Sequence, residues 1–295
     1  MAISAGTNKT IDTTIPHRVV PDSARAYIAL TAGILTQTIN GMDSLLQMPF
    51  GCGEQNMINF APDVYITKYL ASSGQLKPEI MAKAEKFMIT GYQRELTYRH
   101  NDGSFSAFGN NDASGSLWLT DFVLKSFAEA KGIIYIDDAV LSSAARWIVS
   151  HQNSDGSFDQ VGFVSHQELL GGLKGKDALT AYTAIALMKA GEKTASARAV
   201  AYLETRIGGM TDPYAVAITT YALEMAKSPK AGDAYKLLMS LAKADDNGLH
   251  WGGDVVVPPP LTQQAPMMPR FNPYVNRSAD IETTAYATLA LGVHG

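Results

Sequence analysis

The sequence contains very little cysteine, one residue in 295, and this scarcity limits how the fold can be stabilised. A single thiol cannot form an internal disulfide, so the chain must depend on a packed core, and its cysteine usage does not identify a compartment. No run of apolar residues is long enough to span a bilayer. The net charge of −4 lacks the basic excess of a nucleic-acid-binding domain. We therefore expect neither a membrane span nor a nucleic-acid partner.

The first residues, Met1-Ala2-Ile3-Ser4, lack the basic start and apolar stretch of a signal peptide. Two interpretations follow: the chain is intracellular, or it is a piece of a longer secreted precursor. Hydrophobic residues make up 46% of the sequence, enough to bury a full core. The composition is that of a globular protein, and the length permits one large domain or two ordinary ones.

The one cysteine lies in Gly51-Cys52-Gly53-Glu54-Gln55-Asn56-Met57, three positions before a glutamine. A thiolate at Cys52 that displaces ammonia from the Gln55 carboxamide would form an internal thioester, which stores an acyl group for later transfer. Glycines on both sides suit the tight backbone that such a ring requires. The alternative is a buried, inert structural cysteine, but that alternative does not explain the flanking glycines.

This heptapeptide resembles the thioester signature of the complement and alpha-2-macroglobulin superfamily, and the preceding run Asp43-Ser44-Leu45-Leu46-Gln47-Met48-Pro49-Phe50 resembles the approach to it there. The resemblance implies secretion as part of a larger precursor, which favours the second interpretation of the N-terminus. It also implies a thioester-containing domain with an α/α toroid fold. No cofactor is implied.

The spacing of apolar residues predicts an all-α domain. Helical periodicity occupies segments near 54–72, 77–99, 116–132, 137–152, 177–190, 193–206, 214–227, 231–243 and 280–293. Glycine and proline breakers between them are close enough together to predict antiparallel helical hairpins. The segments at 137–152 and 231–243 carry more polar residues than the others and are expected to lie outside.

A weak internal repeat supports this architecture. Asp102-Gly103-Ser104-Phe105 recurs as Asp155-Gly156-Ser157-Phe158, with a fainter echo in Asn247-Gly248-Leu249-His250-Trp251. A helix rich in small and apolar residues follows each copy. Inner helices ringed by outer ones would form an α/α toroid of helical hairpins, as the family resemblance implies.

Two segments depart from the helical pattern. The alternation around residues 18–31 indicates a strand, and by family resemblance residues 1–32 are a linker strand from a neighbouring β-domain. The toroid is expected to occupy 33–295 and to be truncated at its C-terminus. The proline-rich stretch 255–276 indicates a long surface loop or a site for a proline-seeking partner. Asn8 and Asn276 begin sequons that would accept glycans in a secreted protein.

A histidine is the expected second partner in the chemistry. The run Val164-Ser165-His166-Gln167-Glu168-Leu169-Leu170 resembles the segment that carries the catalytic histidine in complement members of the family. The resemblance implies that His166 attacks the Gln55 carbonyl to give an acyl-imidazole, after which the Cys52 thiolate acts as general base for an incoming hydroxyl. Glu168 either orients or helps to deprotonate His166, or stabilises a helix dipole. Glu54 has a similar helix-start explanation.

Several alternatives stay open. Gly91-Tyr92-Gln93-Arg94-Glu95-Leu96 looks more like the macroglobulin branch and insect thioester proteins, which leaves an amine-reactive protease trap possible. A Cys–His protease is a weaker enzyme candidate. No metal site is expected, because the other histidines are scattered and no HExxH spacing occurs.

The resemblance predicts a single-turnover module rather than a turnover enzyme. It would transfer its acyl group to hydroxyl-bearing target surfaces, an opsonin-like role in innate immunity. Further expected partners are the remaining domains of the precursor. A receptor or regulator that binds the hydrolysed domain is the alternative function.

Overall fold

The computed structural model describes residues 45–245, 248–252 and 277–295. The predicted strand at 18–31, the boundary between 32 and 33, the proline-rich segment 255–276 and the sequons at Asn8 and Asn276 lie outside these residues and stay predictions. The expected C-terminal truncation is likewise untested.

The described part of the chain is almost entirely helical, as predicted. It contains the α-helices α2 (Gly53–Ser72), α3 (Pro78–Glu95), α4 (Leu117–Ala130), α5 (Asp138–Ser150), α6 (Gly175–Lys189), α7 (Lys193–Arg206), α8 (Pro213–Met225), α9 (Ala231–Ser240) and α10 (Arg277–His294). Short 3-10 turns occur at Leu96–Tyr98, Gly109–Asn111, Gln167–Leu170 and Ile207–Gly209. None of the helices in these ranges is both long and apolar enough to cross a membrane.

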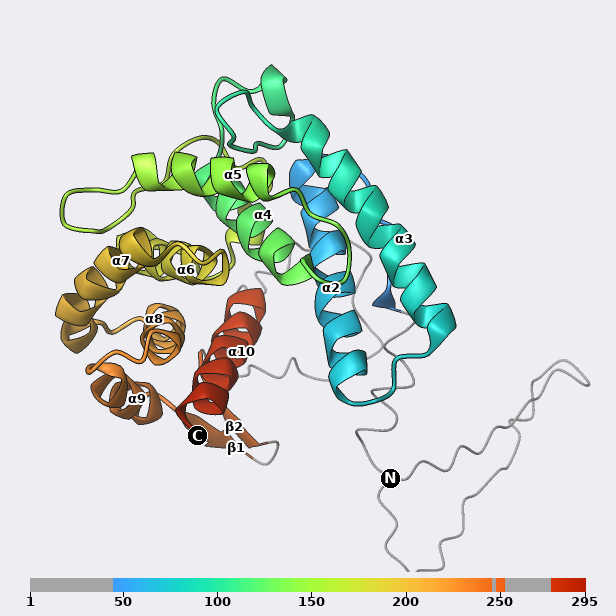
Figure 1. The fold of residues 1–295 in the computed structure, drawn as a ribbon. Coiled ribbons are helices and arrows are strands. Elements are labelled where there is room, and N and C mark those ends of the chain that lie inside the picture. Colours follow the sequence, from blue (N-terminus) through green and yellow to red (C-terminus); the bar gives the residue numbers. More distant parts are fainter. Residues whose placement is uncertain (1–44, 246–247, 253–276) are drawn as a thin grey trace, which may run out of the picture. The chain divides into compact units, whose positions relative to one another are not determined.

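Consecutive helices pair into hairpins, and the hairpins pack side by side in a curved row (Figure 1). Helices α2, α4, α6, α8 and α10 form the inner layer, each contacting the next, while α3, α5, α7 and α9 cover them from outside. In α6 every residue from Ala178 to Leu187 is buried, whereas α9 buries only Ala231, Ala234 and Leu238. Since a helix that is apolar nearly all round needs neighbours on all sides, this contrast explains the two layers. The prediction of a helical-hairpin toroid with outer segments at 137–152 and 231–243 is confirmed.

One element was not predicted from the sequence. Strands β1 (Lys243–Asp245) and β2 (Gly248–His250) form an antiparallel pair in which Ala244 lies opposite Leu249. Strands of three residues are too short to show an alternating pattern, so the periodicity of the preceding helix masked them.

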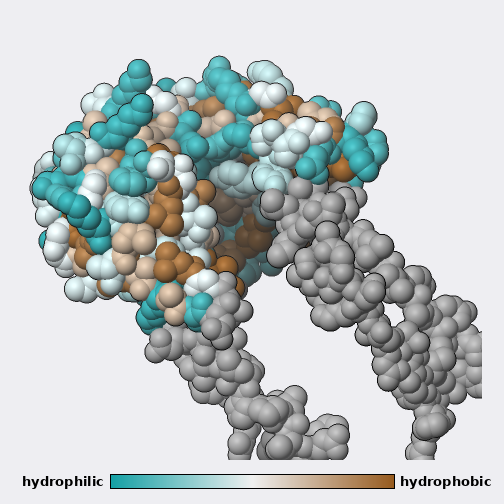
Figure 2. Space-filling view, turned by 90° about the horizontal axis from the view of Figure 1, so that it is seen from below, coloured by the Kyte–Doolittle hydropathy of each residue, from teal (hydrophilic) through white to brown (hydrophobic). Residues whose placement is uncertain are grey.

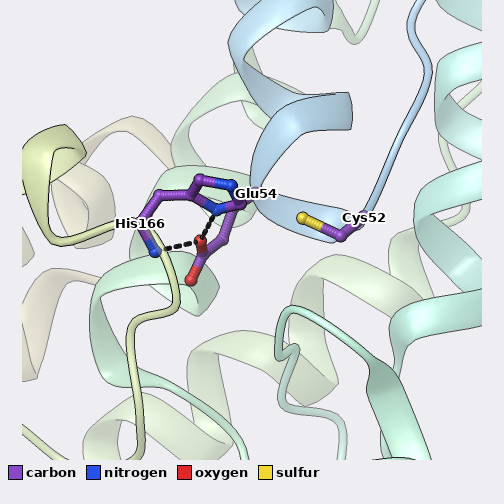
Figure 3. A group of neighbouring side chains, drawn as sticks. All are labelled: Cys52, Glu54 and His166. Atoms are coloured by element: carbon purple, nitrogen blue, oxygen red, sulfur yellow. Dashed lines mark hydrogen bonds and ion pairs between the residues drawn. The ribbon is translucent and has the colours of Figure 1, made fainter.

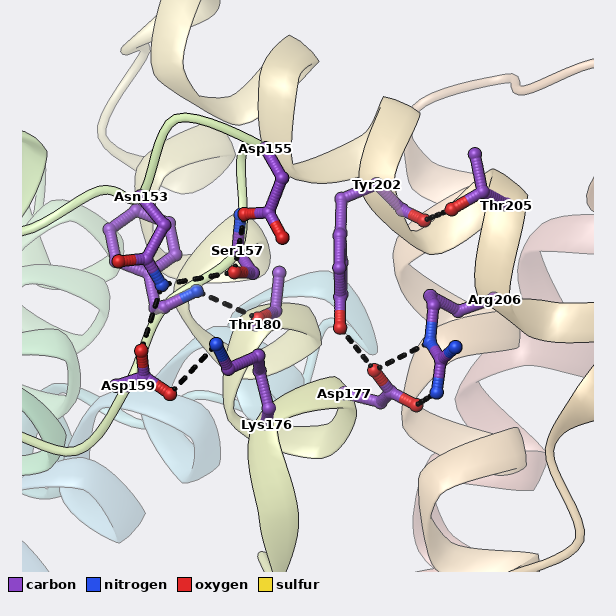
Figure 4. Close-up of polar contacts among 11 residues, drawn as sticks. Asn153, Asp155, Ser157, Asp159, Lys176, Asp177, Thr180, Tyr202, Thr205 and Arg206 are labelled. Carbon is purple, nitrogen blue, oxygen red and sulfur yellow. Dashed lines mark hydrogen bonds and ion pairs between the residues drawn. The ribbon is translucent and has the colours of Figure 1, made fainter.

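The internal repeat is a repeat of hydrogen bonds as well as of residues. In the first copy, Ser104 donates its backbone N–H and its hydroxyl to Asp102, at 3.0 and 2.6 Å. In the second copy, Ser157 makes the same two bonds to Asp155, at 3.0 and 2.6 Å (Figure 4).

Each turn is then joined to the inner helix that follows it. The backbone N–H of Phe105 donates to Thr120 Oγ1 at 3.0 Å, and that of Phe158 donates to Thr180 Oγ1 at 3.0 Å. The faint third copy keeps this contact, because the Trp251 N–H donates to Thr284 Oγ1 at 3.1 Å. Each copy thus uses a threonine hydroxyl, buried in the first two copies and half-buried in the third, to satisfy a backbone donor.

An aromatic cluster holds the first two hairpins together. The ring of Phe127 on α4 receives Phe60, Tyr92 and Phe105 edge-on or nearly so, with centroids 5.3, 5.0 and 6.3 Å away. These partners come from α2, α3 and the first repeated turn. The cluster therefore fixes the start of α2 relative to α3 and α4, which positions the residues described next.

Candidate functional site

Cys52 lies at the N-cap of α2, immediately after a glycine with an unusual backbone. Gly51 has a φ of +83°, a conformation that L side chains rarely adopt. A Cβ built there would lie 2.2 Å from Gln55 Oε1. The Gly51 carbonyl accepts hydrogen bonds from Tyr98 Oη at 2.7 Å and Arg94 Nε at 2.9 Å. The chain is therefore held in the one geometry that leaves room for the Gln55 side chain beside Cys52.

Glycine is required at position 53 for a different reason than at position 51. Gly53 donates its N–H to the Ala107 carbonyl at 2.9 Å, and a Cβ at Gly53 would lie 2.9 Å from the Ser106 carbonyl oxygen. It is required because another backbone segment approaches closely, rather than for a positive φ. The expectation that both glycines serve the tight turn alone is corrected here.

Gln55 turns back toward Cys52 within the first turn of α2. Its Oε1 accepts the Cys52 backbone N–H at 3.2 Å. Its Nε2 lies 3.4 Å from His166 Nε2. Cys52 is not part of a disulfide, and the Gln55 carboxamide marks where the acyl group of a thioester would lie. The structure brings together the three residues that the sequence analysis selected.

The carboxylate that holds His166 belongs to Glu54 (Figure 3). The Glu54 side chain is fully buried, and its Oε2 accepts the His166 N–H at 2.9 Å and lies 2.6 Å from His166 Nδ1. Its Oε1 accepts the Ser165 N–H at 2.8 Å. A carboxylate can only accept, so in the neutral ring Nδ1 carries the proton and the lone pair of Nε2 accepts a hydrogen bond from Gln55 Nε2 at 3.4 Å. That lone pair faces Gln55.

This arrangement differs from the expectation for Glu54. Glu54, interpreted from sequence as helix-start chemistry alone, anchors the His166 loop with three hydrogen bonds. The backbone of Glu168 lies in the 3-10 turn Gln167–Leu170, but its side chain is outside the described part, so its own role stays a prediction. Sequence reasoning missed Glu54 because an acid in the first turn of a helix already has a common explanation.

Asn56, the next residue of the signature, locks α2 onto α3. Its Nδ2 donates to the Gly91 carbonyl at 2.9 Å and to Glu95 Oε2 at 2.8 Å. Burial raises the pKa of the Glu95 carboxyl well above its ordinary value, which favours its neutral form. The pair keeps the reactive turn fixed relative to Tyr98 and Arg94.

One metal-like cluster occurs in the described ranges, and it coincides with this site. Cys52, Glu54 and His166 each place a ligand-type atom within 4.8 Å of the others. Thiolate, carboxylate and imidazole are zinc ligands, and the sequence analysis missed this group because its spacing matches no metal motif. Both Glu54 oxygens already accept N–H groups. These residues could hold a metal only by releasing the contacts that orient His166.

Comparison with known proteins identifies the family of this chain. The family described as "A-macroglobulin TED domain" matches residues 27–293. The chain is 36% identical over 282 residues to ovostatin of Gallus gallus, an alignment that covers 94% of this chain. It spans only 19% of the length of ovostatin. The chain belongs to the thioester-containing domains of the alpha-2-macroglobulin and complement family.

Proposed function

We propose that this domain transfers an acyl group once, from an internal Cys52–Gln55 thioester to a hydroxyl on a target surface. The observation that carries the proposal is the placement of His166, whose Nε2 lies 3.4 Å from the Gln55 carboxamide while its Nδ1 is bound to Glu54. A nucleophile oriented by a buried acid and in contact with the carboxamide that would supply the acyl group is an arrangement suited to covalent catalysis.

The proposed reaction begins with formation of the thioester. The Cys52 thiol loses its proton, the thiolate attacks Gln55 Cδ, the C–N bond breaks, and the amide nitrogen takes up that proton and leaves as ammonia. His166 Nε2 lies close enough to that nitrogen to exchange a proton with it. The stored thioester then contains a good leaving group, since a thiolate is far less basic than an amide anion.

Transfer follows in two steps. His166 Nε2 attacks Gln55 Cδ and releases the Cys52 thiolate, which leaves an acyl-imidazole. The thiolate then removes the proton from an incoming hydroxyl, whose oxygen forms the ester and releases the imidazole. Glu54 acts as a positioning residue, because its negative charge stabilises the positive charge that the imidazole acquires on acylation.

This geometry favours acyl transfer over a Cys–His protease. In such a protease the imidazole would be directed at the thiol, whereas here the contact of His166 Nε2 is with the Gln55 carboxamide. The domain would act in a larger secreted protein as an opsonin-like tag in innate immunity, carrying glycans at its sequons. Its partners would be hydroxyl-bearing surfaces, its neighbouring domains, and a receptor for the hydrolysed form.

A second candidate is an amine-reactive thioester of the protease-trap type, favoured by the match to a macroglobulin domain. The test is the intact mass of thioester-bearing protein after incubation with glycerol or methylamine. We expect an adduct at Gln55, one new thiol at Cys52, and faster reaction with glycerol. The variant His166→Asn should lose the glycerol reaction and keep the methylamine reaction. A wild type that reacts only with methylamine would support the second candidate instead.

A further inference from the structure

A cavity of about 350 Å³ lies where the five inner helices meet. Its wall contains Ile58 and Tyr65 of α2, Trp118 and Lys125 of α4, Tyr182 of α6, Tyr214 of α8 and Tyr286 of α10, and the segment after His166 contributes Leu169 and Leu170. Figure 2 shows a hollow on this face with hydrophobic residues in its depth. The volume is at the lower end of the range for small-molecule sites.

The cavity wall contains one lysine, Lys125, and this lysine has no ion-pair partner among the described residues. The nearby carboxylate of Glu129 on α4 is already paired with two other lysines. Its Oε2 pairs with Lys68, and its Oε1 lies 2.6 Å from Lys189 Nζ. Lys125, one turn before Glu129, makes no hydrogen bond or ion pair among the described residues. Its Nζ lies instead over aromatic faces, 4.9 Å from the ring centroid of Tyr182 and 5.9 Å from that of Phe122.

These surroundings make Lys125 a stronger nucleophile than a surface lysine. Burial and the positive charge of Lys189 lower the pKa of Lys125 to about 8, although Glu129 and Asp121 act in the opposite direction. At pH 7.4 about a fifth of such amines are neutral, against about one in a thousand for an ordinary lysine. A desolvated lysine beside another cation is the type of amine that forms Schiff bases with carbonyl compounds.

We propose that this cavity binds a small aromatic aldehyde or ketone and that Lys125 Nζ forms a Schiff base with it. The neutral amine attacks the carbonyl carbon, a C–N bond forms, and the carbonyl oxygen leaves as water with the two amine protons, which gives an imine. No oxidant or reductant is required. The aromatic rings of the wall would stack on the ring of the ligand.

The reaction should depend on pH through Lys125 and its surroundings. Asp121 and Glu129 from α4 and Lys189 from α6 interact electrostatically with Lys125, and Lys68 from α2 shares Glu129 with Lys189. The other titratable groups of the cavity wall are Tyr65 from α2, Tyr182 from α6, Tyr214 from α8, and Glu282 and Tyr286 from α10. Lys68 and Lys189 keep their partner Glu129 charged near neutrality, so Lys125 is the group expected to titrate near pH 8.

The test is reductive trapping of 4-hydroxybenzaldehyde with cyanoborohydride at pH 7, followed by peptide mapping. We expect Lys125 to gain the mass of the aldehyde less one oxygen atom at least tenfold faster than the exposed Lys131. Lys125→Arg keeps the positive charge and should abolish that adduct, while the matched control Lys189→Arg should keep it. Labelling no faster than at Lys131, in the folded wild type, would overturn the proposal.

A competition measurement tests the cavity apart from the amine. 4-Hydroxybenzyl alcohol carries the same ring but no carbonyl, so it should slow labelling at Lys125 and leave labelling at Lys131 unchanged. Equal rates with and without this alcohol would show that the cavity does not bind the ring, and would refute the proposal. Labelling should be the same in a Cys52→Ala variant, which separates this site from the thioester chemistry.

Discussion

Replacing Glu54 with glutamine tests the link between the buried carboxylate and His166. The change keeps the size of the side chain but removes the charge that accepts the His166 Nδ1 proton at 2.6 Å. The new amide group can also place an N–H against the Ser165 or His166 backbone N–H, where only an acceptor fits. Hydrogen bonds to charged groups contribute about 1.5–3 kcal/mol each. Loss of the imidazole contact alone should therefore slow the His166 step by about 10- to 150-fold.

The assay is release of the Cys52 thiol from thioester-bearing protein, with glycerol or methylamine as the nucleophile. We expect Glu54→Gln to lower the glycerol rate constant by that factor and to change the methylamine rate constant by less than about twofold, because direct aminolysis does not use the imidazole. A conservative variant, Glu54→Asp, should recover part of the glycerol rate. Circular dichroism and thermal unfolding would show that each variant is folded.

Glu168→Gln is the matched control, since it removes an acid two positions from the same histidine. If the glycerol rate falls in Glu168→Gln and is unchanged in Glu54→Gln, the assignment of the orienting carboxylate to Glu54 is wrong. A fall in both glycerol and methylamine rates would mean that Glu54 maintains the reactive turn rather than the imidazole.

Three further predictions concern the framework of the site. Gly53→Ala places a Cβ 2.9 Å from a backbone oxygen, so it should lower the melting temperature and the thioester yield. Gly232→Ala, with open space around it, should leave both nearly unchanged. Equal effects of the two substitutions would contradict the close-approach explanation. Burial raises the pKa of Asp63 to about 7, so the folded state keeps a proton that the unfolded state loses as the pH rises above about 4. The free energy of unfolding should then fall as the pH rises to about 7. Measured by urea unfolding from pH 5 to 8, this fall should be about 1 kcal/mol per pH unit smaller in Asp63→Asn than in the wild type. The same pH dependence in both proteins would refute this. Thr180→Val leaves the buried Phe158 N–H without its acceptor and should lower the free energy of unfolding, measured with denaturant, by about 1–3 kcal/mol. A decrease of less than about 0.5 kcal/mol would count against a stabilising role for the repeated hydrogen bond.

Much of the fold could be predicted because helices depend on local periodicity. The segment 177–190 is apolar or small nearly all round, and α6 is the buried inner helix that this pattern predicts. The β1–β2 pair could not be predicted in the same way, because three residues do not establish a period of two. The faint Trp251 repeat was supported by the sequence, but its meaning became clear only from the bond to Thr284.

For the site, the sequence by itself determined the reactive pair, since Cys52 and Gln55 are close along the chain and their bond needs only one turn of helix. It also indicated His166 through a resemblance in its surrounding residues. The tertiary structure alone decided that Glu54 holds this histidine and that Lys125 lies in a cavity wall with no ion-pair partner among the described residues. Such contacts join residues far apart along the chain, and an acid or lysine on a helix has the same local pattern whether water or a buried partner surrounds it. Local spacing therefore identifies the bond that can form, and packing determines which groups control it.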